Sequence, residues 1–297
     1  MAELRHDKWA GTTYGNGWMH RWLIRFLKAA DVRLLYAFVF MFVIPPTMIV
    51  NSKARNAIYG FYRKGMNFGK ARAVWMTYKN HCAFSQVVID RFAMYAGKKF
   101  RIKVEGYDLF KGLCEDPEGF IQLSSHIGNY EIAGYSLPTE EKRFNALVFG
   151  GEKESVMTNR NRLFKGNNIR MISMQPDMSH LFEINKVLAD GEILSMPADR
   201  IFGSQKNFRI PFLGSDANFP QGPFLLAAVR DVPMLFVSVM KTGAKEYTAK
   251  VKRIGKNADK SGKQRAEELA REYVAMLEES VNEHPAQWYN YFDFWRD

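Results

Sequence analysis

The hydrophobic pattern of the chain changes near Phe100, and the new pattern narrows the folds that the rest of the chain can adopt. From that point, short runs of β-forming residues alternate with stretches that have helical spacing. This alternation predicts an α/β domain with a mostly parallel central sheet flanked by helices. We expect strands at Arg101–Val104, Phe120–Leu123, Phe144–Phe149, Ile169–Met174, Glu192–Met196, Met234–Met240 and Tyr247–Ile254. We expect helices at Ser179–Asp190, Gly222–Arg230 and Arg265–Glu283, with Gly191 placed to end the first of them.

The segment Leu34–Val50 holds 17 residues without a charge and has basic side chains on both sides. This length is at the lower limit for crossing a bilayer, and Pro45-Pro46 interrupts it. Because positive charge lies on both sides, the flanks favour neither orientation. Residues 21–28 mix apolar and basic side chains, as an interfacial helix does. We therefore predict a shallow or re-entrant membrane anchor on the cytoplasmic face, with a short span and a buried core helix as the alternatives.

Positive charge is concentrated in the first third of the chain. Residues 1–103 carry a net charge of +14, although the whole chain carries only +11. Such a distribution indicates an anionic partner, which could be a membrane surface, an acidic carrier protein or a nucleic acid. The basic residues surround an apolar run and are not interleaved with an aromatic platform, which argues against nucleic acid. A boundary near Gly97 divides a basic, helical, membrane-anchoring region at residues 1–97 from an α/β domain at residues 98–297.

The sequence offers little support for metal, redox or nucleotide chemistry. The two cysteines, Cys82 and Cys114, have no Cys-x-x-Cys or Cys/His neighbourhood, so neither a disulfide framework nor a zinc site is expected. The sequence contains no phosphate loop, His-Glu-x-x-His or Gly-x-Ser-x-Gly segment. We therefore predict that the chain uses no metal and no other cofactor.

The segment from His126 to Glu131 is the main candidate for a catalytic site. It follows the expected buried strand at Phe120–Leu123, and sites in α/β domains lie at such strand ends. The two residues could meet only if His126 lay on the loop and Glu131 in the first turn of a following helix. Gly128 would permit that turn and Asn129 would cap the helix. A carboxylate on one imidazole nitrogen would let the other nitrogen take a proton from a hydroxyl or amine. Spacing alone is weak support, because chance would give about 0.6 such pairs in this chain. A histidine that only packs in a loop is the alternative.

Several segments, in a fixed order, connect this motif to a known family. SSHIGNYEIAG, at residues 124–134, resembles the first motif of the lysophospholipid acyltransferase superfamily, in which a histidine, four residues and an acidic residue form the catalytic dyad. The later segments resemble the branch of late (lauroyl or myristoyl) acyltransferases of lipid A biosynthesis. Those segments are PADR (197–200), RIPFLG (209–214), NFPQGP (218–223) and HPAQWYNYFDFW (284–295).

This resemblance implies that a fatty acyl chain moves from an acyl thioester to a hydroxyl or amine of a membrane lipid, such as a lipid A precursor. The donor would be acyl carrier protein or acyl-CoA. His126 would be the general base and Glu131 its partner. Arg200 would stabilise the oxyanion, and Asp199 would shape the acceptor pocket. The other expected substrate contacts are Gly128, Asn129, Gly222 and Glu152, with Arg160 and Arg162 as competitors of Glu152.

The resemblance also implies a location on the cytoplasmic face of the inner membrane. Two alternatives to a lipid A enzyme stay open. One is a glycerolipid or amino-acid-lipid acyltransferase of the same superfamily, because Asp199-Arg200 is closer to the glycerolipid pattern than to the lipid A pattern. The other is a non-catalytic membrane-surface protein that keeps the fold and only binds lipid.

Overall fold

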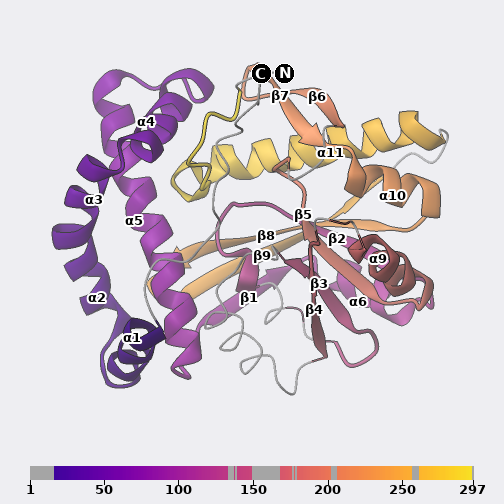
Figure 1. The fold of residues 1–297 in the computed structure, drawn as a ribbon, viewed down its shortest axis with the longest axis horizontal. Coiled ribbons are helices and arrows are strands. Elements are labelled where there is room, and N and C mark those ends of the chain that lie inside the picture. Colours follow the sequence, from indigo (N-terminus) through magenta and orange to yellow (C-terminus); the bar gives the residue numbers. More distant parts are fainter. Residues whose placement is uncertain are drawn as a thin grey trace.

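The computed structural model describes residues 17–132, 137, 139–148, 168–175, 177, 179–201, 206–255 and 261–295. Helices from the N-terminal third form one side of the molecule, and the remaining helices cover a central sheet (Figure 1). The helices are α1 (Gly17–Ala29), α2 (Val32–Phe38), α3 (Ile44–Val50), α4 (Ser52–Gly60), α5 (Lys70–Tyr95), α6 (Tyr107–Glu115), α9 (His180–Ala189), α10 (Gly222–Arg230) and α11 (Gly262–Glu283). Shorter helical turns are η1 (Val39–Val43), η2 (Phe61–Gly65), η3 (Tyr130–Ile132) and η4 (Pro285–Gln287).

The described strands form a seven-stranded sheet and a separate hairpin. The order in the large sheet is β1-β9-β8-β2-β5-β3-β4, and all neighbours run parallel except β8 and β9. The strands are β1 (Arg101–Glu105), β2 (Phe120–Ser124), β3 (Phe144–Val148), β4 (Ile169–Ser173), β5 (Ile193–Pro197), β8 (Met234–Gly243) and β9 (Glu246–Ile254). The hairpin pairs β6 (Asn207–Phe212) with β7 (Ser215–Pro220). The predicted α/β class and mostly parallel sheet are confirmed.

Side chains alternate along the strands and form two hydrophobic layers, one on each face of the sheet. In β2, Ile121 and Leu123 belong to the layer shared with α9, α10 and α11, whereas Phe120 belongs to the layer shared with α6. All five residues of β2 are buried. A strand buried on both faces lies in the interior of a parallel sheet, and this position brings the end of β2 into the centre of the molecule.

The β6–β7 hairpin has no counterpart among the expected strands. Its segments coincide with two of the motif blocks, and each contains a proline, Pro211 and Pro220, which weakens a strand signal. The hairpin closes through Leu213 and Gly214, which both have positive φ, at 52° and 80°. This is the backbone of a tight hairpin turn, so the glycine was the available signal.

The apolar N-terminal segment forms one helical run through α2, η1 and α3. At residues 32–50 it is long and apolar enough to cross a membrane, and among the described helices it is the one that meets this test. Pro45 and Pro46 lie in the first turn of α3, directly after the π-helical turn η1, so the prolines alter the helix without ending it. The run lies against α5 along its length and has contacts to it through α2, η1 and α3.

Candidate active site

The register of two neighbouring strands brings the candidate site together. Ser124 at the end of β2 is aligned with Pro197 at the end of β5, and the Ala198 N–H donates to the Ser124 carbonyl at 3.0 Å. His126 and Asp199 each lie two residues beyond the aligned pair. Parallel strands that end at the same edge therefore deliver these two side chains to the same place.

Asp199 holds His126 through two hydrogen bonds. The His126 backbone N–H donates to Oδ2 at 2.8 Å, and the ring nitrogen Nδ1 lies 2.7 Å from Oδ1. The Asp199 side chain is fully buried, and 16% of the His126 side chain is exposed. Since a carboxylate can only accept, Nδ1 carries the ring proton and Nε2 is left as an acceptor. This is the tautomer that a general base requires.

Burial favours the neutral form of the His126 imidazole. Burial lowers the pKa of His126 below its usual 6.5; the positive charge of Arg200 adds to this effect and the negative charge of Asp199 opposes it. Burial by itself would raise the pKa of Asp199, but its hydrogen bonds and attraction to His126, together with Arg200, hold that pKa below its usual 3.8. The pair is therefore a neutral base next to an ionised carboxylate.

The loop after His126 lies between β8 and the C-terminal segment. The Gly128 N–H donates to the Gln287 carbonyl at 2.8 Å, and the Asn129 N–H donates to the Val239 carbonyl at 2.7 Å. The Tyr289 N–H donates to the His126 carbonyl at 2.9 Å. Gly128 has φ +61°, and a Cβ atom there would lie 2.0 Å from the Val239 oxygen. Glycine is therefore required for the turn, as the sequence predicted.

Arg200 lies beside the pair and is anchored to the C-terminal segment. Its Nε donates to Asn290 Oδ1 at 3.1 Å, and its Nη2 donates to the Tyr289 carbonyl at 2.6 Å. The guanidinium carbon lies 5.5 Å from the centre of the Phe292 ring. These contacts hold a positive charge close enough to His126 to change its pKa.

Glu131 does not occupy the position that the sequence predicted for it. The carboxylate on Nδ1 of His126 belongs to Asp199, and Glu131 forms an ion pair with Arg91 of α5 at 3.1 Å. Glu131 follows the loop in the short 3-10 turn η3, and the α-helical first turn expected there is absent from the described residues. A catalytic role for Glu131 stays a prediction, but its assignment as the hydrogen-bond partner of His126 is corrected to Asp199.

The other predicted contacts are divided by the fold. Asn129 lies in the loop, where its side chain is buried and donates to the Tyr247 hydroxyl at 3.4 Å. Gly222 starts α10 next to the β6–β7 hairpin, and no described contact joins it to His126. Glu152 lies outside the described residues. Among those residues, no group of three or more His, Cys, Asp or Glu side chains could hold a metal ion.

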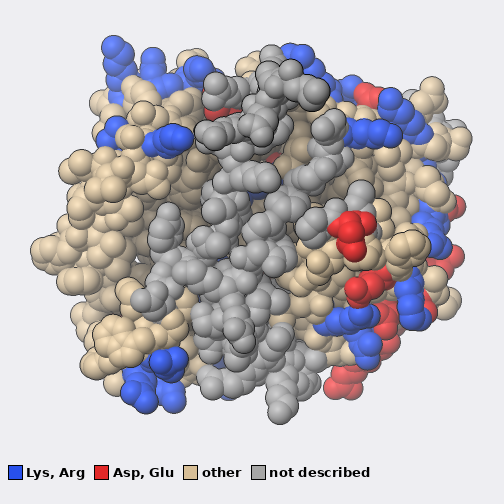
Figure 2. Space-filling model, viewed as in Figure 1, with Lys and Arg blue, Asp and Glu red and all other residues tan. Residues whose placement is uncertain are grey.

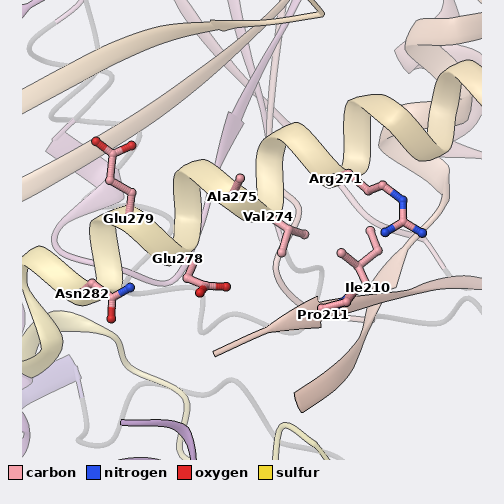
Figure 3. Close-up of a pocket in the computed structure, with 8 residues that line it drawn as sticks. All are labelled: Ile210, Pro211, Arg271, Val274, Ala275, Glu278, Glu279 and Asn282. Carbon is pink, nitrogen blue, oxygen red and sulfur yellow. The ribbon is translucent and has the colours of Figure 1, made fainter. Parts of the chain in front are cut away.

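A separate open groove of about 490 Å³ lies between α11 and β6 (Figure 3). Val274 and Ala275 of α11 and Ile210 and Pro211 of β6 form its apolar part. None of its lining residues belongs to the loop or to the His126–Asp199 pair.

The role of Asp199 was missed because strand order is not visible in a sequence. The available signal was the equal distance of His126 and Asp199 from the ends of two expected strands, at residues 123 and 196. That signal becomes useful only once β2 and β5 are known to be neighbours.

A neutral imidazole oriented by a buried carboxylate, at the carboxyl edge of a parallel sheet, is an arrangement that can act in general acid–base chemistry. The family described as bacterial lipid A biosynthesis acyltransferase matches residues 88–296, more than half of the chain. The chain belongs to this family and is an acyltransferase of lipid metabolism.

Among solved structures, the 1-acyl-sn-glycerophosphate acyltransferase PlsC from Thermotoga maritima is similar, with 15% identity and a TM-score of 0.41. The match covers 92% of this chain and 100% of that one. No curated protein matches the chain.

Proposed function

We propose that the protein transfers a fatty acyl chain from an acyl thioester to a hydroxyl or amine of a membrane lipid, with His126 as the general base. The observation that carries this proposal is the hydrogen bond between His126 Nδ1 and Asp199 at 2.7 Å, which leaves Nε2 as the proton acceptor. Membership of the acyltransferase family supports the reaction type.

The proposed reaction needs no covalent enzyme intermediate. His126 Nε2 takes the proton of the acceptor hydroxyl while its oxygen forms a bond to the thioester carbonyl carbon. The tetrahedral intermediate carries the negative charge on the former carbonyl oxygen. When it collapses, the carbon–sulfur bond breaks and the leaving thiolate receives the proton from Nε2. Asp199 stabilises the imidazolium that exists between these two transfers.

We assign to Arg200 the stabilisation of the oxyanion. Its guanidinium is fixed by Asn290 and by the Tyr289 carbonyl, so its charge is held in place before the reaction begins. A positive charge that needs no rearrangement is an effective way to stabilise negative charge that develops in the transition state.

We propose acyl carrier protein as the donor, with acyl-CoA as the second candidate, and a lipid A precursor as the acceptor. The basic N-terminal third supports an acidic carrier, because opposite charges steer association. A glycerolipid or amino-acid lipid would present the same hydroxyl or amine nucleophile and is the alternative acceptor.

The test is turnover by the purified full chain in lipid vesicles, with acyl carrier protein and CoA thioesters supplied separately. His126→Ala should lower turnover by about 10²–10⁴-fold, the usual contribution of a general base. His284→Gln is the matched control, because His284 ends α11 and lies outside the pair. Retention of turnover in His126→Ala within a few-fold would refute the proposal. Lipid binding without consumption of either thioester would instead support a non-catalytic lipid-binding protein.

We also propose that the protein docks on one leaflet of the inner membrane, from the cytoplasmic side, and does not span it. The helical run at residues 32–50 has an outward stripe with Leu34, Phe38 and Phe42 exposed by 68%, 53% and 63%. Its opposite stripe packs on α5. In Figure 2 the side formed by this run is largely free of charge, and Lys and Arg side chains lie above and below it. Exposed apolar residues bordered by basic ones suit an anionic membrane surface.

The packing of the run argues against a span. Perpendicular insertion would take α5 into the bilayer as well, because α2, η1 and α3 all contact it. Helix α5 carries Lys70, Arg72 and Lys79, and charged side chains within a bilayer are costly.

Labelling from one side of the membrane tests this orientation. Lys28 and Lys53 are exposed residues that flank the run, and both native cysteines are buried. Lys28→Cys and Lys53→Cys should both react with a membrane-impermeant maleimide added from the cytoplasmic side. Reaction of the two positions from opposite sides would mean that the run spans the membrane.

A further inference from the structure

A buried polar cluster lies where the N-terminal helices meet the sheet. It consists of Asp90 of α5, Tyr36 of α2, Lys241 of β8 and Tyr247 of β9, and we call it the Asp90 cluster. The hydroxyl groups of Tyr36 and Tyr247 donate to the Asp90 carboxylate, and Lys241 Nζ lies 2.5 Å from Asp90 Oδ2. The side chain of Asp90 is fully buried and that of Lys241 is 7% exposed. Four elements from distant parts of the chain therefore meet at one carboxylate.

Because the Asp90 cluster is buried, its hydrogen bonds fix the relative positions of the elements that form it. Burial raises the pKa of Tyr247 far above its usual 10, so its hydroxyl keeps its proton and must donate it. Lys241 also donates to the Ala244 carbonyl at 3.0 Å. A buried charge that loses a partner has no water to replace it, so a shift of one element is resisted by the others.

Two chains of hydrogen bonds connect the Asp90 cluster to the catalytic loop. In the first, the Asn129 side chain donates to the hydroxyl of Tyr247 at 3.4 Å. In the second, the Gln287 side chain pairs with both backbone groups of Lys241 at 2.9 Å. The Gln287 carbonyl in turn accepts the N–H of Gly128 at 2.8 Å. Both chains end in the turn that directly follows His126.

The cluster also reaches the proposed membrane-docking surface. Tyr36 lies on the inner stripe of the same helical run whose outer stripe contains Leu34 and Phe38. The residue after Asp90, Arg91, pairs with Glu131 at 3.1 Å and so adds a third tie between α5 and the segment that follows the loop.

We propose that Asp90 is a positioning residue for acyl transfer, because it couples the seating of α2 on the protein to the conformation of the loop at residues 126–129. It does not touch the substrate in this scheme. It fixes Tyr247 and Lys241, which hold Asn129 and Gln287 and thereby orient the turn after the base. This inference rests on the proposed role of His126.

Tyrosine-to-phenylalanine variants test the coupling, because each removes one hydroxyl group and leaves the ring in place. Tyr36→Phe and Tyr247→Phe remove donors from the Asp90 cluster. Tyr78→Phe is the matched control, since the Tyr78 hydroxyl also joins α5 to the apolar run, at 3.1 Å from the Phe40 carbonyl, but lies outside the cluster. Asp90→Asn is less informative, because it would leave Lys241 buried without its carboxylate.

Two measurements on the full chain in vesicles that contain anionic phospholipid separate positioning from stability. Both cluster variants should lower kcat roughly three- to tenfold, the equivalent of one hydrogen bond, with KM for the thioester unchanged. Amide exchange at Gly128 and Asn129 should become faster in both variants, even though Tyr36 lies on a different element. Tyr78→Phe should match the parent chain in kcat and in exchange.

Equal losses of Tm in all three variants, with unchanged kcat and unchanged exchange at the loop, would overturn the proposal. The exchange measurement needs no turnover, so it distinguishes this inference from the proposed function. If exchange is faster in the cluster variants but turnover survives His126→Ala, the coupling would be supported and the role of His126 as general base would be refuted.

Discussion

Replacing Asp199 with asparagine should remove the negative charge behind His126 while keeping the shape of the site. The carboxylate is fully buried, both of its oxygens accept hydrogen bonds from His126, and Arg200 lies close enough to lower its pKa. The amide oxygen of asparagine can still accept from Nδ1, but its NH2 group cannot accept the His126 backbone N–H as Oδ2 does. What is lost is this backbone hydrogen bond and, with a larger effect on the rate, the attraction between the carboxylate and the imidazolium that forms after proton transfer.

The size of the effect follows from Coulomb's law. Two unit charges about 4 Å apart attract by about 4 kcal/mol at an effective dielectric constant of about 20. Each 1.4 kcal/mol or so of lost transition-state stabilisation slows a reaction about tenfold, which gives a loss of about 10³-fold. Because the asparagine dipole retains part of the hydrogen bond, we expect kcat to fall by about 10²–10³-fold.

The assay is consumption of the acyl thioester at saturating acceptor, together with Tm to exclude unfolding. Glu131→Gln provides the comparison, since Glu131 is the acidic residue that the sequence predicted as the partner of His126. A loss of less than fivefold in Asp199→Asn, together with a loss above a hundredfold and an unchanged Tm in Glu131→Gln, would refute our assignment of the partner.

Three further predictions concern the same region. Turnover should decline as the pH falls below 6.5, because protonation of His126 removes the base. In Asp199→Asn this decline should move to lower pH, because the carboxylate charge raises the pKa of His126 and is lost in the variant. Glu131→Gln should lower the free energy of unfolding by about 1.5–3 kcal/mol in urea titrations, since Arg91 loses a charged partner, while kcat falls by less than about tenfold; unchanged stability would contradict the ion pair. Gly128→Ala should lower the free energy of unfolding by at least about 2 kcal/mol in the same titration and abolish turnover, because its Cβ would overlap the Val239 carbonyl. A stable, active variant would contradict the turn geometry.

The positions of the elements in the α/β region could be predicted from the sequence because their signals are local. The strand expected at residues 120–123 is β2, at Phe120–Ser124, and the helix expected at residues 265–283 is α11, at Gly262–Glu283. Gly191, with φ +76°, lies just past the end of α9 as expected. Periodicity and chain breakers act within a few residues, so they can be read without knowing the fold.

The catalytic loop was predictable for the same reason. His126 lies two residues beyond the end of the buried strand β2, and Gly128 permits the turn with its positive φ of 61°. A strand end and a glycine two residues apart from the histidine are features of one short segment. The base and the turn that positions it could therefore be predicted from the sequence.

The partners of that loop were decided only by the tertiary structure. Glu131 is near His126 in the sequence, but Asp199 is the residue that bonds to it in space, because β5 is a neighbour of β2 in the sheet and the two strands end in register. The Asp90 cluster likewise joins Tyr36 to Lys241, two residues that lie 205 positions apart. Hydrogen bonds and ion pairs act over about 3 Å in space, whatever the number of residues between the two partners. Local pattern therefore determined where the base lies, and strand order and helix packing determined which carboxylate serves it and which residues hold it in position.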